Sequence, residues 1–552
     1  MAAISTQVLI CGAGPAGLAL AVELGTRGVK CIVVERNDRV GYAPRAKTTH
    51  TRTREHFRRW GIAEDLAAMA PFGVDYPSNI QFVTRLGGFP LATIENAFNC
   101  APERNEFYAE HAQWVPQYRV EEVLRRRAES LPSVQVLFEH EFLEAEQDKD
   151  GVTCRVRAAG ADNVLRCDYL VGADGARSAI RDLIGAQMEG RYGLAHAYNI
   201  VFRAPGLSRL HKHGPGIMYW QINADVPSVI GPMDKDDLWY FMRGRVEGLT
   251  ELDKLSAAEL IQRSMGLDTP IEILSTDEWA ASEFIADKYS EGRIFLIGDA
   301  CHLHPPVGGY GMNMGIGDSV DLGWKMAAVL HGWGGQGLLK SYEQERRQVH
   351  RFVIDAALSN HATLSLHDAM SPTLEADSDE GAALRAQVGA LLAEGRAQEF
   401  RSLGVMLGAS YDDSPIMAEE GGAPARDPAM RTYEPTARPG ARAPHAWLDD
   451  GRSLYDVFGE GFTLIGFERA GDAELQRAEA DAHGLGIPLK TIRITDARIA
   501  ALYERSLVLI RPDQHVAWRG DVWPGAEILL LASGRAAVEA RQAVTPKSAV
   551  VR

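Results

Sequence analysis

The segment from Asp299 to Asn313, DACHLHPPVGGYGMN, concentrates residue types that do chemistry. Cys301, His302 and His304 carry side chains that bind zinc. His302 and His304 flank a single residue, however, and no later Cys/His pair completes a tetrahedral set. The prolines and glycines that follow indicate a backbone that a flat or phosphorylated ligand approaches closely. The pattern therefore favours a ligand-binding loop and predicts no metal, with a metal site and a plain structural loop as the alternatives.

A second glycine-rich motif, GAGPAG, lies near the start of the chain, between an apolar run and a helical pattern. Gly12 permits a tight turn, Gly14 lets a pyrophosphate approach the backbone, and Gly17 allows close helix–strand packing. Glu35 closes the next apolar run and can accept hydrogen bonds from ribose hydroxyls. Because strand, helix and acidic residue occur in this order, the motif predicts a dinucleotide site, with a merely structural glycine turn as the alternative.

The elements that must position these motifs follow from the apolar periodicity. Residues 6–36 predict strand, glycine turn, helix and strand, and CDYLVGADGARSAIRDLIG predicts strand, turn and helix. Alternating strands dominate from about 190 to 285, and a long helical region runs to about 370. Residues 371–440, rich in Asp, Glu, Gly, Ala and Pro, are predicted to form a linker or loose segment. A small α/β unit begins at about 441.

Composition excludes several classes of protein. With 46% hydrophobic and 24% charged residues, the 552-residue chain has a globular balance and the length of two or three domains. A net charge of -16 makes nucleic acid a poor partner. Six cysteines without a CxxC pair suit reduced thiols in a cytoplasmic protein. No apolar run reaches the roughly 18–20 residues of a membrane span, so we expect no membrane association.

Three motifs together carry a resemblance to a known family. GAGPAG, DYLVGADGARSAIR and IFLIGDACHLHPPVGGYGMNMGIGD occur in this order. They resemble the fingerprints of the class A FAD-dependent aromatic hydroxylases, the family of p-hydroxybenzoate, phenol and 3-(3-hydroxyphenyl)propionate hydroxylases. Residues from 441 resemble the thioredoxin-like C-terminal domain of the phenol hydroxylase branch. No cysteine lies beyond Cys301, so this domain is predicted to serve packing or dimer formation, with substrate gating as the alternative, but not dithiol chemistry.

The resemblance implies an α/β fold with a Rossmann-like FAD-binding domain, an inserted β-sheet substrate domain and a C-terminal thioredoxin-like domain. The FAD-binding domain would comprise residues 1–75, 105–190 and 286–370. The substrate domain would comprise residues 76–104 and 191–285. A linker over 371–440 would lead to the thioredoxin-like domain over 441–552.

The resemblance also assigns cofactor contacts. The pyrophosphate would lie on GAGPAG, with Glu35 on the adenosine ribose; Asp174 and Gly175 match a DG motif used for FAD and NAD(P)H, and Asp299 would bind the ribityl or pyrophosphate region. The full set of cofactor-binding candidates is Gly12, Gly14, Pro15, Ala16, Gly17, Glu35, Arg36, Arg45, Gln117, Asp174, Gly175, Asp299, Pro306, Gly308, Gly311, Met312 and Asn313. Pro305, Gly308, Gly311, Met312 and Asn313 would line the isoalloxazine.

The implied reaction consumes NADPH or NADH and O₂ and hydroxylates a small phenolic or other electron-rich aromatic compound through a flavin hydroperoxide. A phenol must share or lose its proton to react, which requires a base or hydrogen-bond partner. The catalytic candidates are His50, Tyr219, Tyr240 and Pro305. The tyrosines lie on predicted pocket strands and have an ordinary core position as their alternative, and His50 has an indirect supporting role as its alternative.

Two other functions stay open. One is Baeyer–Villiger or epoxidising chemistry on a polyketide-type aromatic, which some relatives of this family perform. The other is flavin or nucleotide binding without turnover. The extra C-terminal domain favours a homodimer.

Overall fold

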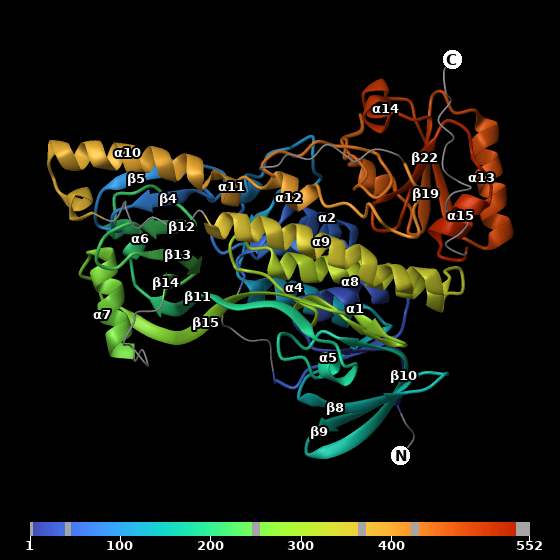
Figure 1. The fold of residues 1–552 in the computed structure, drawn as a ribbon, viewed down its shortest axis with the longest axis horizontal. Coiled ribbons are helices and arrows are strands. Elements are labelled where there is room, and N and C mark those ends of the chain that lie inside the picture. The colour runs from blue at the N-terminus through green and yellow to red at the C-terminus, as the bar shows by residue number, and fades with distance from the viewer. Residues whose placement is uncertain (1–3, 39–45, 245–253, 363–370, 421–429, 537–552) are drawn as a thin grey trace.

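The computed structural model describes residues 4–38, 46–244, 254–362, 371–420 and 430–536. Figure 1 shows three regions side by side: a second sheet at one end, the first sheet with its helices in the middle, and the C-terminal domain, in orange and red, at the other end. Within the described residues, no helix is both long and apolar enough to cross a membrane.

The first sheet has a parallel core of five strands in the order β17-β10-β1-β2-β7. Val8, Leu9 and Ile10 of the central strand are wholly buried, as expected when helices cover both faces of a sheet. The remaining strands pair antiparallel at its margins. The strands are β1 (Ile4–Cys11), β2 (Cys31–Val34), β7 (Val134–Leu137), β8 (His140–Gln147), β9 (Val152–Ala158), β10 (Ala161–Gly172), β16 (Ser290–Glu291) and β17 (Ile294–Leu296).

Helices pack around this sheet and connect its strands. Helix α1 lies against α4 and α8, and α8 lies against α9, which runs between the middle region and the far sheet (Figure 1). The short strands β3 (Thr48–Thr49) and β6 (Gln113–Trp114) pair with each other. The helices are α1 (Pro15–Thr26), α2 (Thr51–Arg59), α3 (Ala63–Ala68), α4 (Gln117–Ser130), α5 (Ala179–Leu183), α8 (Gly311–Leu330) and α9 (Gln336–Ala362).

The second sheet joins two segments that are distant in sequence. Its order is β18-β15-β11-β14-β13-β12-β4-β5, so the strands of residues 80–94 lie beside those of residues 188–286. Helix α7 packs on β15. The elements are β4 (Ile80–Val83), β5 (Pro90–Ile94), β11 (Met188–Arg203), α6 (Leu207–Leu210), β12 (Met218–Gln221), β13 (Ser228–Asp234), β14 (Leu238–Gly244), α7 (Lys254–Met265), β15 (Glu272–Ala286) and β18 (His302–Leu303).

Residues 371–440, which the composition predicted to be a linker, contain packed helices. Helix α10 (Asp379–Gly395) lies against β5, and α11 (Ala397–Phe400) and α12 (Leu403–Leu407) follow it. Val388, Leu392 and Phe400 join a buried apolar cluster with strands of the second sheet. The expectation of a loose segment is therefore corrected: the apolar side chains of this region are buried against the inserted sheet.

The C-terminal domain is a small mixed sheet of order β20-β19-β21-β22. Two separate apolar clusters cover its faces, one containing Leu464 and Leu509 and the other Ile465 and Val508. This alternation along each strand confirms an α/β unit with helices on the sheet. The elements are β19 (Phe462–Phe467), α13 (Asp472–Leu485), β20 (Leu489–Ile494), α14 (Ala497–Tyr503), β21 (Leu507–Ile510), β22 (Val516–Gly520) and α15 (Glu527–Ala532).

Candidate functional site

The glycine turn between β1 and α1 has the geometry that each glycine was expected to provide. Gly12 has φ of +112°, and a Cβ placed there would lie 2.2 Å from the carbonyl oxygen of Ala173. A Cβ on Gly17 would lie 1.9 Å from the Gly12 oxygen, so only glycine lets helix and turn pack this closely. A Cβ on Gly14 would meet nothing within 4 Å. Open space therefore lies over the first turn of α1, whose free N–H groups favour a phosphate.

Glu35 follows β2 and turns its carboxylate toward this helix start. Its Oε2 accepts a hydrogen bond from the Ala13 N–H at 3.0 Å, and its Oε1 accepts one from the Asn37 N–H at 3.0 Å. The side chain is thus held beside the glycine turn, with lone pairs left for ribose hydroxyls. Arg36 is exposed. Arg45 lies outside the described residues.

The two aspartate motifs lie at the same edge of the sheet. Asp174 and Gly175 follow β10, the neighbour of β1, and Asp299 follows β17, one strand further along the sheet. Asp174 has one buried oxygen, Oδ1, without a hydrogen-bond partner. Gly175 has φ of +81° and open space where a Cβ would stand. Asp299 is exposed although its neighbours Gly298 and Ala300 are buried. Ligands of open α/β sheets bind at such an edge.

The loop before α8 completes the wall of this space. Pro305 is buried and Pro306 exposed; Gly308 has φ of +89°, and Gly311 has open space at its Cβ position. Met312 is half-buried. Because this loop presents prolines and glycines without bulky side chains, a flat ring can lie close to its backbone. The N-terminus of α8 favours negative charge.

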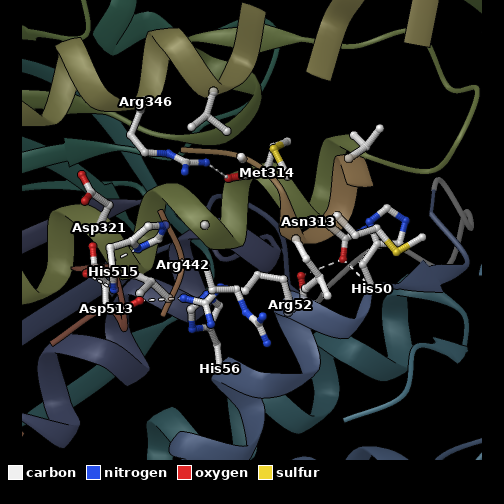
Figure 2. Close-up of a pocket in the computed structure, with 18 of the residues that line it drawn as sticks. His50, Arg52, His56, Asn313, Met314, Asp321, Arg346, Arg442, Asp513 and His515 are labelled. Carbon is white, nitrogen blue, oxygen red and sulfur yellow. Dashed lines mark hydrogen bonds and ion pairs between the residues drawn. The ribbon is translucent and has the colours of Figure 1, made fainter. Parts of the chain in front are cut away.

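Asn313 holds this loop to α2, as Figure 2 shows. Its Oδ1 accepts hydrogen bonds from the His50 N–H at 2.8 Å and the Thr53 hydroxyl at 2.7 Å. Its Nδ2 donates to the carbonyls of Thr48 at 3.0 Å and Gly309 at 2.8 Å. The amide is 3% exposed and fully bonded to protein. Its side chain therefore fixes the loop, a role that the sequence expectation of a flavin contact did not include.

His50 is the N-cap residue of α2 and is 2% exposed. Burial lowers the pKa of its imidazole to about 4, so the ring is neutral near pH 7. Its Nε2 lies 3.1 Å from the Gly308 carbonyl oxygen. Because a carbonyl only accepts, Nε2 carries the proton and Nδ1 is left as the acceptor. His50 thus contacts the glycine loop through Nε2 and keeps Nδ1 as a hydrogen-bond acceptor.

Tyr219 and Tyr240 lie in packed surroundings. The Tyr219 hydroxyl donates to the Gly214 carbonyl at 3.0 Å, and the Tyr240 hydroxyl donates to the Ile217 carbonyl at 3.1 Å. Both side chains are no more than 1% exposed, and burial raises the pKa of each hydroxyl. This geometry favours the core alternative for both tyrosines.

Gln117 begins α4 and points back to the segment before β3. Its Oε1 accepts from the Ala46 N–H at 3.2 Å, and its Nε2 donates to Glu121 Oε1 at 2.8 Å. The side chain therefore ties α4 to the chain that leads into His50.

The residues of this edge fit a bound FAD. Open space over Gly14, Gly175 and Gly311, an unpartnered buried oxygen on Asp174 and an exposed Asp299 surround one region at the ends of β1, β10 and β17. The family profile described as "FAD binding domain" matches residues 5–357, more than half of the chain. A second profile, "Aromatic-ring hydroxylase, C-terminal", matches residues 436–539.

The chain belongs to the family of FAD-dependent aromatic-ring hydroxylases.

Relatives of known activity and structure agree with this membership. The 2,4-dichlorophenol 6-monooxygenase of Delftia acidovorans is 31% identical and aligns over 94% of this chain and 96% of its own. Aklavinone 12-hydroxylase DnrF of Streptomyces peucetius is 33% identical over 84% and 92% of the two chains. The rebeccamycin biosynthetic enzyme RebC with reduced flavin is 35% identical, covers 97% of this chain and all of its own, and has a TM-score of 0.87. The protein is accordingly a flavin-dependent monooxygenase, and the predicted fold class is confirmed.

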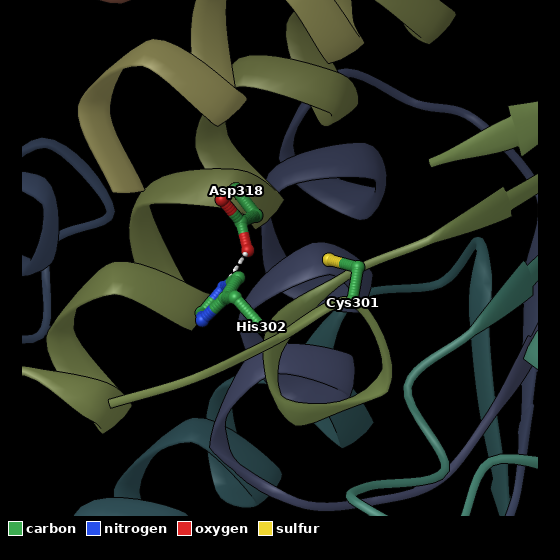
Figure 3. A group of neighbouring side chains, drawn as sticks. All are labelled: Cys301, His302 and Asp318. Carbon is green, nitrogen blue, oxygen red and sulfur yellow. Dashed lines mark hydrogen bonds and ion pairs between the residues drawn. The ribbon is translucent and has the colours of Figure 1, made fainter. Parts of the chain in front are cut away.

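Three possible metal ligands of this hydroxylase lie together, and His302 and Asp318 form a hydrogen bond; with the contacts described next they are here called the Asp318 hub (Figure 3). Cys301, His302 and Asp318 bring one ligand atom each within 4.8 Å of the others. Asp318, however, already accepts from the Gly298 N–H at 2.9 Å, from His302 Nε2 at 2.7 Å and from Arg346 Nε at 2.7 Å. Burial raises the pKa of the Cys301 thiol, which disfavours a thiolate ligand. The hub therefore supports the interpretation of a ligand loop anchored by protein contacts.

Sequence reasoning missed three members of this hub: Asp318, Arg346 and His350. His350 Nε2 lies 2.9 Å from Asp318 Oδ1, and its Nδ1 lies 2.7 Å from the Tyr289 hydroxyl. Arg346 and His350 are one helical turn apart, which places them on one face of α9. That spacing was the available signal, but nothing in the sequence indicates that this face meets α8.

Proposed function

We propose that this enzyme hydroxylates a phenolic or other electron-rich aromatic compound, with NADPH or NADH as the reductant. In the overall reaction, two electrons from the reduced nicotinamide and two protons reduce O₂. One oxygen atom enters an aromatic C–H bond, and the other leaves as water. The observation that carries the proposal is the glycine-lined space at the ends of β1, β10 and β17, in a chain whose relatives include a dichlorophenol monooxygenase and an aklavinone hydroxylase.

Specific residues would hold the cofactor. The N–H groups at the start of α1 would bind the pyrophosphate above Gly14, Glu35 would bind the ribose hydroxyls, and Asp299 would face the ribityl or pyrophosphate region. Pro305, Pro306, Gly308, Gly311 and Met312 would line the ring. When bound, FAD would supply the transfer of electrons from nicotinamide to O₂.

We propose that His50 is the polar partner of the substrate hydroxyl. Its neutral ring keeps one nitrogen as an acceptor, and it lies against Gly308 of the glycine loop. An acceptor there would take a hydrogen bond from the phenol hydroxyl and so raise the electron density of the phenol ring. Its edge-on contact with Tyr310, with ring centroids 5.4 Å apart, fixes the orientation of the imidazole.

The test is an anaerobic titration of the flavin-loaded protein with NADPH, then NADH, with and without a pool of aromatics containing 2,4-dichlorophenol and an anthracyclinone. Flavin bleaching that is fast only with an aromatic, followed by a hydroxylated product after O₂ is admitted, is the expected result. A product with oxygen inserted into the ring skeleton would establish Baeyer–Villiger chemistry instead. Nicotinamide oxidation that no aromatic stimulates, with peroxide as the sole product, would refute hydroxylation.

We further propose a cytoplasmic homodimer. All six cysteines are buried and unpaired, which suits a reducing compartment. The additional C-terminal domain offers surface for a second copy of the chain. Sedimentation of the flavin-loaded protein across a concentration series tests the dimer, and a monomer at every concentration would refute it.

A further inference from the structure

The turn between β21 and β22 is buried, which is unusual for a connecting segment. Arg511 is 1% exposed, Asp513 2%, Gln514 3% and His515 8%. These residues, here called the 511–515 turn, enter between α2, α8 and α9 of the FAD-binding domain (Figure 2). A polar turn is buried only when its charges are matched by partners, so the contacts it makes are specific ones.

The first set of contacts is a buried charge cluster that joins the turn to α8 and α9. Arg511 donates to Asp321 at 3.0 Å and to Glu345 at 2.8 Å. Lys325 donates to the same two carboxylates, at 2.8 Å and 2.6 Å. The four side chains are at most 1% exposed. Asp513 adds a contact to α8 by accepting from the Trp324 indole N–H at 3.2 Å.

The second set of contacts leads to His50. Arg52, two residues after His50, donates to the Asp513 carbonyl at 2.6 Å and to Gln514 Oε1 at 2.6 Å. The next residue, Thr53, donates to Asn313, which also accepts from the His50 N–H. The 511–515 turn therefore contacts the first turn of α2. This is the turn that Asn313 joins to the glycine loop by hydrogen bonds.

A cavity of about 60 Å³ lies between these contacts (Figure 2). His50 and Asn313 line one end, and Asp513 and His515 line the other. The Nδ1 atom of His56, also in the lining, is buried without a hydrogen-bond partner. A volume of this size admits water. Because Asp513 and His515 line it, the C-terminal domain closes a cavity that extends to His50, the proposed partner of the substrate hydroxyl.

We propose that the 511–515 turn of the C-terminal domain is a positioning element of the hydroxylase site. It holds α2 and the start of α8 so that His50 and the glycine loop keep their relative geometry around the flavin. A correctly placed loop keeps water from the reacting atoms, so its displacement releases reducing equivalents as peroxide. This inference rests on the proposed function only where product yield is measured. The affinity for FAD can be measured whether or not the enzyme hydroxylates an aromatic compound.

The experiment compares Gln514→Met, which removes the acceptor for Arg52 while keeping side-chain length, with Gln514→Glu, which keeps an acceptor. Arg519→Met is the matched control, since Arg519 lies in the same domain and contacts Glu420 and Glu504 instead. Measurements are the FAD dissociation constant, the amount of hydroxylated product per NAD(P)H oxidised, and the midpoint of thermal unfolding.

We expect Gln514→Met to weaken FAD binding and to lower the product yield per NAD(P)H, each about tenfold, the effect of losing one hydrogen bond to a charged group. Gln514→Glu should restore both, and Arg519→Met should change neither beyond its effect on unfolding. Equal values for Gln514→Met, Arg519→Met and the wild type would overturn the inference. A wild type that binds FAD but hydroxylates nothing would refute the proposed function. The FAD dissociation constants of the variants would still decide whether the 511–515 turn positions the site.

Discussion

Replacing Gly14 by alanine should separate cofactor binding from folding. Gly14 has φ of -73° and ψ of -179°, which alanine adopts without strain, and its Cβ would meet no protein atom within 4 Å. The apoprotein should therefore unfold at nearly the wild-type temperature. A pyrophosphate over this turn would overlap the new methyl group, and overpacking of this kind costs about 1–3 kcal/mol. FAD binding should weaken by about 5- to 150-fold.

The magnitude can be read in two assays. FAD at about 100 times its dissociation constant stabilises a protein by about 2.7 kcal/mol. An unfolding entropy of about 2.1 cal/mol/K per residue gives about 1.2 kcal/mol/K for 552 residues, so the wild-type midpoint should rise by about 2 °C. At that same FAD concentration the Gly14→Ala midpoint should rise by only about 0.3–1.5 °C. Quenching of FAD fluorescence gives the two dissociation constants directly.

Two further glycines are the controls for Gly14→Ala. Gly471 is likewise an N-cap glycine with open space at its Cβ position, but it lies in the C-terminal domain, so Gly471→Ala should bind FAD like the wild type. Gly17→Ala would place a methyl group 1.9 Å from the Gly12 oxygen and should destabilise the apoprotein itself. Wild-type FAD affinity in Gly14→Ala would refute the placement of the pyrophosphate over this turn.

Three other variants test the electrostatics and packing. Burial raises the pKa of Asp321 above its ordinary 3.8, so its contribution to stability is complete below pH 3.8 and is lost as the pH rises through the raised pKa. The wild type should therefore lose unfolding free energy relative to Asp321→Asn as the pH rises from 5 to 8 in urea titrations, and parallel pH profiles would contradict this. Burial opposes ionisation of Glu23, yet Arg59 and its neighbours lower its pKa to about 2, so its stabilisation is present above 4.5 and is lost as the pH falls toward 2. Glu23→Gln should cost about 3 kcal/mol at pH 7 and almost nothing near pH 2, and a difference independent of pH would disprove the pairing. Tyr240→Phe removes one hydrogen bond to the Ile217 carbonyl and should lower stability by about 1 kcal/mol with kcat unchanged, whereas a large loss of kcat would return Tyr240 to the catalytic candidates.

Local patterns predicted the fold class and the glycine turn between β1 and α1. The spacing of Gly12 and Gly17 depends on contacts within one strand–turn–helix unit, and the structure shows those contacts at the expected positions. The region around α10 was misjudged because its alanines and glycines resemble a linker. Ser378, whose hydroxyl accepts from the Gly381 N–H, was the helix-start signal that composition alone passes over.

The remaining contacts join residues too distant in sequence for any local pattern to pair. Arg52 meets the Asp513 carbonyl across 461 positions, and Arg511 meets Glu345 across 166. Each residue alone is typical of a solvated surface. Only the packing of the C-terminal domain against α8 and α9 brings them together, and no local sequence pattern predicts that packing.

The buried charge cluster also limits how the C-terminal domain of this enzyme can be exchanged for another. A chimaera that receives the C-terminal domain of a relative would bring a new residue opposite Lys325, Glu345 and Arg52, and any mismatch would leave a charge without a counterion inside the protein. A working chimaera therefore needs matched residues on both sides of the junction. A functional graft must therefore include the contact residues on both sides of the domain junction. A cut at residue 440 transfers only those of the C-terminal domain.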